Sequence, residues 1–208
     1  MEPKVERHVL LRLIKALNSN EELPVVATIA SADSGLTAHI LKFVNSAYFG
    51  LKREITSVED AVAFLGQKKL KELAFILLTS SLLTTKGKEE IFKSLLLAYS
   101  AKELAKKRLP HLKDEAFLAG VLYPAYKAAN GELLKMLEEA GVAKEIVEAL
   151  KDGKSPLGLL LRAALSLIPH CTEATKGELP NVPEDKRELI VETCLKAAAE
   201  AKKVIELL

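Results

Sequence analysis

Histidine and cysteine are the side chains best suited to metal or nucleophilic chemistry, and this 208-residue chain holds four of the first and two of the second. No two histidines lie three or four residues apart, so no helix would present a pair of imidazoles on one face. His170 and Cys171 are adjacent and Glu173 follows, but this trio lacks the paired spacing of zinc sites. We therefore expect no metal site and no cofactor.

Nucleophilic and phosphate-binding patterns give the same result. The hydroxyl run Thr79-Ser80-Ser81 lies in an apolar stretch, where such side chains commonly hydrogen-bond to the preceding helical turn. No nucleophile elbow is present, and the glycines are isolated rather than grouped in a phosphate-binding loop. The sequence thus carries no complete catalytic motif of these kinds.

Two basic clusters could contact phosphate. The net charge is only +2, but residues 1–113 hold 18 Lys and Arg against 12 Asp and Glu, whereas residues 114–208 hold 12 against 16. Solvated helix faces are the ordinary explanation for such clusters, so we expect no nucleic-acid partner and keep phosphate binding as an alternative. The basic residues concerned are Lys68, Lys69, Lys71, Lys106, Lys107 and Arg108.

Location follows from the cysteines and the apolar runs. Two cysteines, Cys171 and Cys194, do not make a disulfide framework, and the charged N-terminus does not resemble a secretory signal. The most apolar runs, 74–83 and 157–168, are shorter than the roughly 20 residues that cross a bilayer. We expect a cytoplasmic protein that does not enter the membrane.

The elements that position these residues should all be helices. Leu, Ala, Lys and Glu dominate, aromatic residues are few, and no stretch alternates like a strand. We expect an all-α bundle, with one all-helical domain over 1–168, a loop over 169–185 and a C-terminal helix over 186–208 packing on the domain. Apolar spacing predicts helices over 5–17, 25–32, 34–45, 58–66, 68–83, 91–108, 114–129, 131–140, 143–150 and 156–168.

The segment 45–66 holds the densest set of local signals. Gly50 and Gly66 stand where left-handed residues end helices, and Thr56 precedes Glu59 by the three residues of a capping box. In the structural interpretation, Asn45 satisfies backbone groups, Ala47 allows close helix approach, and Tyr48 and Phe49 anchor the core. A recognition loop is the alternative interpretation. The residues that carry the pattern are Asn45, Ser46, Ala47, Tyr48, Phe49, Gly50, Thr56, Ser57 and Gly66.

This segment closely resembles the HDOD family, the HD-related output domains of bacterial signalling. The resemblance extends over residues 5–125 and is carried by Leu36-Thr37-Ala38, the run 45–50, Ile55-Thr56-Ser57, Ala61 and Leu65-Gly66. The family is similar to the HD and HD-GYP metal-dependent phosphohydrolases, which implies an HD-domain-like helical bundle. Family members generally lack the full set of metal ligands.

The resemblance also places the lost ligands. Tyr99 stands where an HD hydrolase carries its first histidine, and Tyr123-Pro124 stands where the His-Asp pair would be. A degenerate, non-catalytic signalling module that acts on a separate sensor or effector chain is therefore the function we expect, with a homodimer left open. The alternatives are a phosphohydrolase acting on nucleotides or cyclic dinucleotides, and a nucleotide or nucleic-acid binder that uses the basic helices.

Overall fold

The computed structural model describes residues 4–83, 87–129, 131–178 and 181–208, and all regular structure in these ranges is helical. The all-α prediction is confirmed. No helix in these ranges is both long and apolar enough to span a membrane. The helices are α1 (Arg7–Asn18), α2 (Leu23–Ser31), α3 (Ser34–Val44), α4 (Val58–Leu82), α5 (Lys88–Arg108), η2 (Pro110–Leu112), α6 (Lys113–Ala128), α7 (Glu132–Glu139), α8 (Lys144–Lys151), α9 (Pro156–Thr175) and α10 (Glu184–Ile205).

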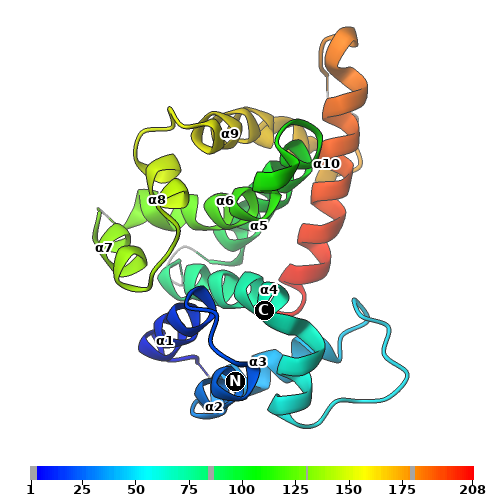
Figure 1. Ribbon diagram of the computed structural model, residues 1–208. Coiled ribbons are helices and arrows are strands. Elements are labelled where there is room, and N and C mark those ends of the chain that lie inside the picture. The colour runs from blue at the N-terminus through cyan, green and yellow to red at the C-terminus, as the bar shows by residue number, and fades with distance from the viewer. Residues whose placement is uncertain (1–3, 84–86, 130, 179–180) are drawn as a thin grey trace.

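The N-terminal layer forms around α4. Helices α1, α2 and α3 all pack against α4, and Figure 1 shows them gathered at one end of the molecule. Leu10, Leu13 and Leu17 of α1 recur at helical spacing and are fully buried. Complete burial of a leucine side chain stabilises the fold by roughly 2 kcal/mol, so this stripe fixes α1 on α4.

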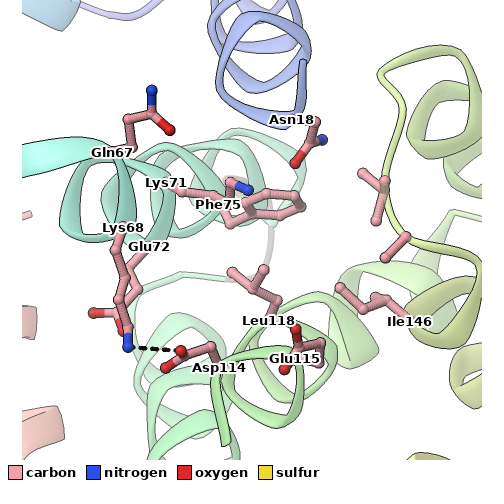
Figure 2. A pocket seen from close by; sticks show the side chains of 12 residues that line it. Asn18, Gln67, Lys68, Lys71, Glu72, Phe75, Asp114, Glu115, Leu118 and Ile146 are labelled. Atoms are coloured by element: carbon pink, nitrogen blue, oxygen red, sulfur yellow. Dashed lines mark ion pairs between the residues drawn. The ribbon is translucent and has the colours of Figure 1, made fainter. Parts of the chain in front are cut away.

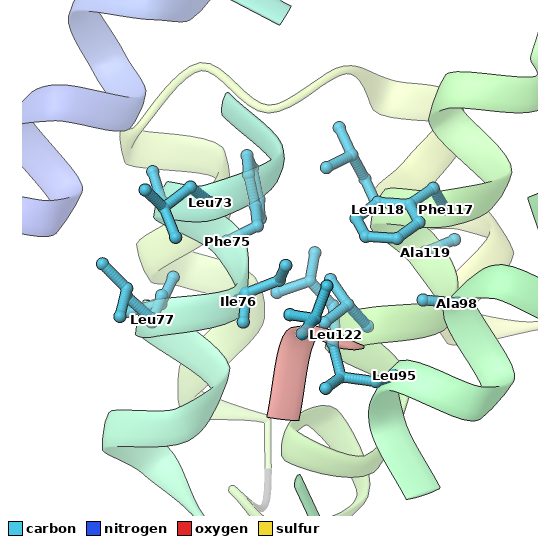
Figure 3. Packing of buried hydrophobic residues seen from close by; sticks show 14 of the residues in the cluster. Leu73, Phe75, Ile76, Leu77, Leu95, Ala98, Phe117, Leu118, Ala119 and Leu122 are labelled. Atoms are coloured by element: carbon cyan, nitrogen blue, oxygen red, sulfur yellow. The ribbon is translucent and has the colours of Figure 1, made fainter. Parts of the chain in front are cut away.

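The central pair is α5 with α6, and it is held by a very close approach. A Cβ atom on Gly120 would lie 2.6 Å from the Ala98 Cα, so only glycine lets the two backbones pack this closely. Leu95 and Leu122 fill the space beside the contact (Figure 3). Helix α6 also packs on α4, which makes the α4–α5–α6 cluster the core of the protein.

Helix α10 lies along α5 and α9 at the side of the bundle (Figure 1). Cys171 of α9 and Cys194 of α10 form a disulfide, with Cα atoms 4.4 Å apart. Our expectation that the cysteines would not form a disulfide framework is wrong for this pair. The two residues are 23 positions apart on separate helices, and their meeting depends on a helix crossing that spacing alone does not reveal.

The expected loop over 169–185 begins too early. Helix α9 continues through Pro169 to Thr175, because the exposed proline ring faces solvent and the buried Cys171 anchors the following turn. Helix α6 likewise continues through Pro124. The gap between the helices expected over 68–83 and 91–108 includes residues 84–86, and the loop expected over 169–185 includes residues 179–180. These residues lie outside the described ones.

In helix α4 the predicted boundary at Gly66 is found, whereas the predicted capping residue is wrong. Gly66 has φ 67° and ψ 170°, a conformation that is essentially restricted to glycine, and it kinks the helix where the sequence predicts a boundary. The capping box is wrong by one residue. The Ser57 hydroxyl, not that of Thr56, accepts the cap hydrogen bond, from Asp60 N–H at 3.1 Å, because Ser57 has the extended backbone of an N-cap.

Candidate functional site

The loop after α3 is fixed by one side-chain amide. Asn45, the C-cap of α3, donates from Nδ2 to the Ile55 carbonyl at 2.7 Å and accepts from Ile55 N–H at 2.8 Å. Ser46 Oγ donates to the Phe43 carbonyl at 2.7 Å, and Gly50 has a left-handed φ of 59°. Asn45 therefore satisfies the backbone, as the structural interpretation predicts, and it closes the loop across ten residues.

Aromatic rings cover the outside of this loop. The Phe49 ring lies 4.9 Å from Tyr48 and 5.5 Å from Phe64, measured between ring centroids. Lysines from two helices flank Tyr48, with Lys69 Nζ of α4 at 5.6 Å and Lys203 Nζ of α10 at 5.8 Å from its ring centroid. Tyr48 and Phe49 are thus half-buried at the surface, where the end of α10 meets the loop.

Ala47 does not occupy a close helix approach. Its side chain is exposed, because α3 ends at Val44 and Ala47 lies in the turn that follows. Thr56 is also exposed, at the edge of the same loop. The segment 45–57 is consequently a surface loop that the Asn45 amide closes and aromatic rings cover.

Tyr99 is buried in the core. Its ring meets Phe117 edge-on, with centroids 5.1 Å apart, and its exposed fraction is 6%. Burial, followed by the nearby Glu72 carboxylate, raises the pKa of the Tyr99 phenol far above its usual value. Glu72 accepts hydrogen bonds from Lys69 at 2.8 Å and Lys102 at 2.6 Å, so its buried charge is balanced.

Tyr123 and Pro124 have a different environment. Both are half-buried on α6, and the Tyr123 ring lies 6.4 Å from that of Tyr126. Lys127 Nζ lies 5.7 Å from the Tyr123 centroid. Among the described residues, no group of three or more His, Cys, Asp or Glu side chains is arranged to hold a metal ion.

The basic residues singled out in the sequence do not form one patch. Four of them are ion-paired: Lys68 with Asp114 at 2.6 Å, Lys69 with Glu72, Lys106 with Glu103, and Lys107 with Glu192. Hydrogen bonds from Lys107 and Lys196 lower the pKa of Glu192 to about 2. Lys71 and Arg108 have no ion pair within 4.0 Å among the described residues.

A cavity of about 290 Å³ lies where α4 and α6 meet the end of α1 and the start of α8, and sequence reasoning did not find it. Figure 2 shows Phe75, Leu118 and Ile146 around it, with Lys71 and Glu115 on opposite helices. Burial lowers the pKa of Lys71, and Glu115 partly opposes this effect. No His, Cys or Ser lines the cavity, so it offers opposite charges and an apolar wall rather than a nucleophile beside a base.

The family model for the HDOD domain matches residues 5–163. The chain belongs to the HDOD domain family. The match ends within α9 and extends well beyond residue 125, where the resemblance seen in the motifs ended. Loop 45–57, Tyr99, and Tyr123 with Pro124 therefore all lie in the HDOD domain, whereas α10 lies outside the matched range.

Two known proteins are similar to this HDOD chain. The cyclic di-GMP phosphodiesterase CdgJ of Vibrio cholerae is 27% identical over 139 residues, which make up 65% of this chain and 32% of that protein. This chain thus matches about a third of the length of that relative. The crystal structure of the MmoQ response regulator from Methylococcus capsulatus is 20% identical, with a TM-score of 0.40 over 96% of this chain and 98% of the other.

Proposed function

We propose that this HDOD protein is a non-catalytic regulatory module that acts through contacts with a separate signalling protein. The observation that carries the proposal is the environment of Tyr99. The position that resembles the first metal-binding histidine of the HD hydrolases holds a buried phenol packed on Phe117. Burial raises the pKa of this phenol far above its usual value, so it keeps its proton and does not supply the imidazole ligand that the metal would need.

The second ligand position supports the same conclusion. A metal-dependent hydrolase needs several oxygen or imidazole ligands that converge on its ions and activate water. Here the resembling pair is Tyr123-Pro124, and proline offers no side-chain ligand. A fold without hydrolytic activity can still act through the surfaces that it presents to other proteins. Two surfaces are held by specific contacts: loop 45–57, which Asn45 closes, and the side formed by α9 and α10, which the disulfide joins. Cytoplasmic location belongs to the same proposal.

The test is to purify the full chain, measure its bound metal, and assay turnover of cyclic di-GMP with manganese or magnesium. An active HD phosphohydrolase assayed in parallel serves as the control. The proposal predicts no stoichiometric metal and no turnover above the protein-free rate. Stoichiometric metal together with turnover would overturn it and would favour the phosphohydrolase alternative.

A further inference from the structure

A second hollow, larger than the cavity beside Lys71, lies on the far side of the core. This groove has a volume of about 840 Å³ and is bounded by the end of α5, one face of α9 and the first turns of α10. Its wall is apolar, with Leu104, Leu160 and Leu167 buried along it. Leu159 on its edge is 55% exposed and extends this apolar wall to the surface.

The charged side chains at the groove are both basic. Arg108 and Lys186 line it together with His170, and no Asp or Glu among the described residues does. Arg108 comes from the basic cluster 106–108, whereas Lys186 lies within residues 114–208, which carry an acidic surplus. Arg108 and Lys186 are exposed and have no ion pair within 4.0 Å among the described residues, and His170 Nδ1 is shielded from solvent without a hydrogen-bond partner.

The groove is also held in shape. The Cys171–Cys194 disulfide joins α9 to α10, and Lys107 of α5 pairs with Glu192 of α10. The disulfide therefore fixes α9 to α10, and the ion pair links α5 to α10. A preformed apolar groove binds with less loss of conformational entropy than one that must be assembled.

We propose that this groove docks an amphipathic helix of a partner protein, with apolar residues against Leu159 and Leu160 and acidic residues beside Arg108 and Lys186. This inference rests on the proposed function, for which it supplies the docking surface. Helices bound the groove and no strand edge is offered, so the fitting mode is a helix in a groove rather than an added strand. The acidic character follows from charge complementarity.

The probe is a fluorescein-labelled peptide designed as an amphipathic helix, with leucines on one face and glutamates beside them. A twin peptide carries lysines in place of the glutamates. Binding to the full chain is followed by fluorescence polarisation at low and high salt. We expect the acidic peptide to bind about tenfold more tightly than its twin, with a preference that shrinks as salt rises.

Variants then locate the site. Leu159→Glu should weaken binding of the acidic peptide by about tenfold, because it replaces an apolar contact at the groove edge with a carboxylate that repels the glutamates of the peptide. Arg108→Glu with Lys186→Glu should reverse the preference in favour of the lysine peptide. The matched controls are Leu195→Glu, at an exposed leucine outside the groove, and Lys52→Glu on the opposite loop, and both should bind like the unaltered chain.

Three results would overturn the docking proposal. They are equal binding of the two peptides or no binding at all, binding that survives Leu159→Glu, and a homodimer in solution that Leu159→Glu dissociates. The last would assign the groove to a second copy of this chain. None of these results touches the metal and turnover assay, so failure of the docking site is distinguishable from failure of the proposed function.

Discussion

The Asn45 side chain holds both backbone polar groups of Ile55, donating to its carbonyl at 2.7 Å and accepting from its N–H at 2.8 Å. This amide takes the place of a short backbone ladder across the loop after α3. The Asn amide carries its donor and its acceptor on two separate atoms, so it makes both bonds at once.

Asn45→Ala should therefore destabilise the protein by about 1–3 kcal/mol, since two partly buried backbone groups lose their partner. Chemical denaturation measures the loss, and hydrogen exchange of the Ile55 amide should accelerate. Thr56→Ala, at an exposed neighbour in the same loop, is the matched control and should change stability by less than about 0.5 kcal/mol. Equal stability of the two variants would contradict the role given to Asn45.

Gly120→Ala should be more damaging, because the added Cβ would meet the backbone of Ala98 at 2.6 Å. Backbone cannot rotate away as a side chain can, so we expect a loss of about 3 kcal/mol or more, or an insoluble product. Thermal unfolding and soluble yield report the effect. Adding Ala98→Gly should not rescue the variant, since the clash is with Cα and N. A Gly120→Ala protein that melts like the original would disprove the close approach.

The raised pKa of the Tyr99 phenol should make the free energy of unfolding depend on pH. Its pKa is raised in the folded protein by burial and by Glu72, so the folded state keeps a proton that the unfolded chain releases near pH 10. The resulting stability is fully present below about pH 10 and is lost above it, by about 1.4 kcal/mol for each further pH unit. Tyr99→Phe should remove this component of the slope. Denaturation curves that shift in parallel for both proteins from pH 9 to 11 would show that Tyr99 does not remain protonated.

The Cys171–Cys194 disulfide should contribute about 3 kcal/mol, the value expected from loop-closure entropy for a loop of this length. Dithiothreitol should lower the melting temperature of the unaltered chain. It should leave a Cys171→Ala, Cys194→Ala double variant unchanged, and that variant should melt like the reduced protein. Thiol titration of the denatured, unreduced protein should find no free cysteine. Two reactive thiols would contradict the pairing.

The local features could be predicted from sequence, and the meetings of distant elements could not. Gly66 kinks α4 where the sequence predicts a helix boundary, because a left-handed glycine acts on its immediate neighbours. The helix through Pro169 was missed because propensity weighs the missing N–H and does not count the buried Cys171 that follows. The pairing of Lys107 with Glu192 joins residues 85 positions apart, so its sequence cluster suggested a free basic face.

The candidate functional regions show the same difference between local features and contacts of distant elements. The HDOD motifs marked the loop 45–57, because its signals are contiguous in the chain, whereas the roles of Tyr99 and Tyr123-Pro124 stay predictions from the resemblance. The groove draws on α5, α9 and α10, and α10 lies outside the family match, so no single segment reveals it. Its one sequence signal was a set of leucines in 157–168 more numerous than a single buried stripe requires.

The most direct measurement of the central claim is anomalous scattering from crystals of the full chain grown or soaked with manganese. The account predicts that Tyr99 packs on Phe117 as described, with no anomalous peak within coordination distance of Tyr99 or Tyr123. A peak there, held by protein side chains, would contradict the account and restore a hydrolytic centre to this fold.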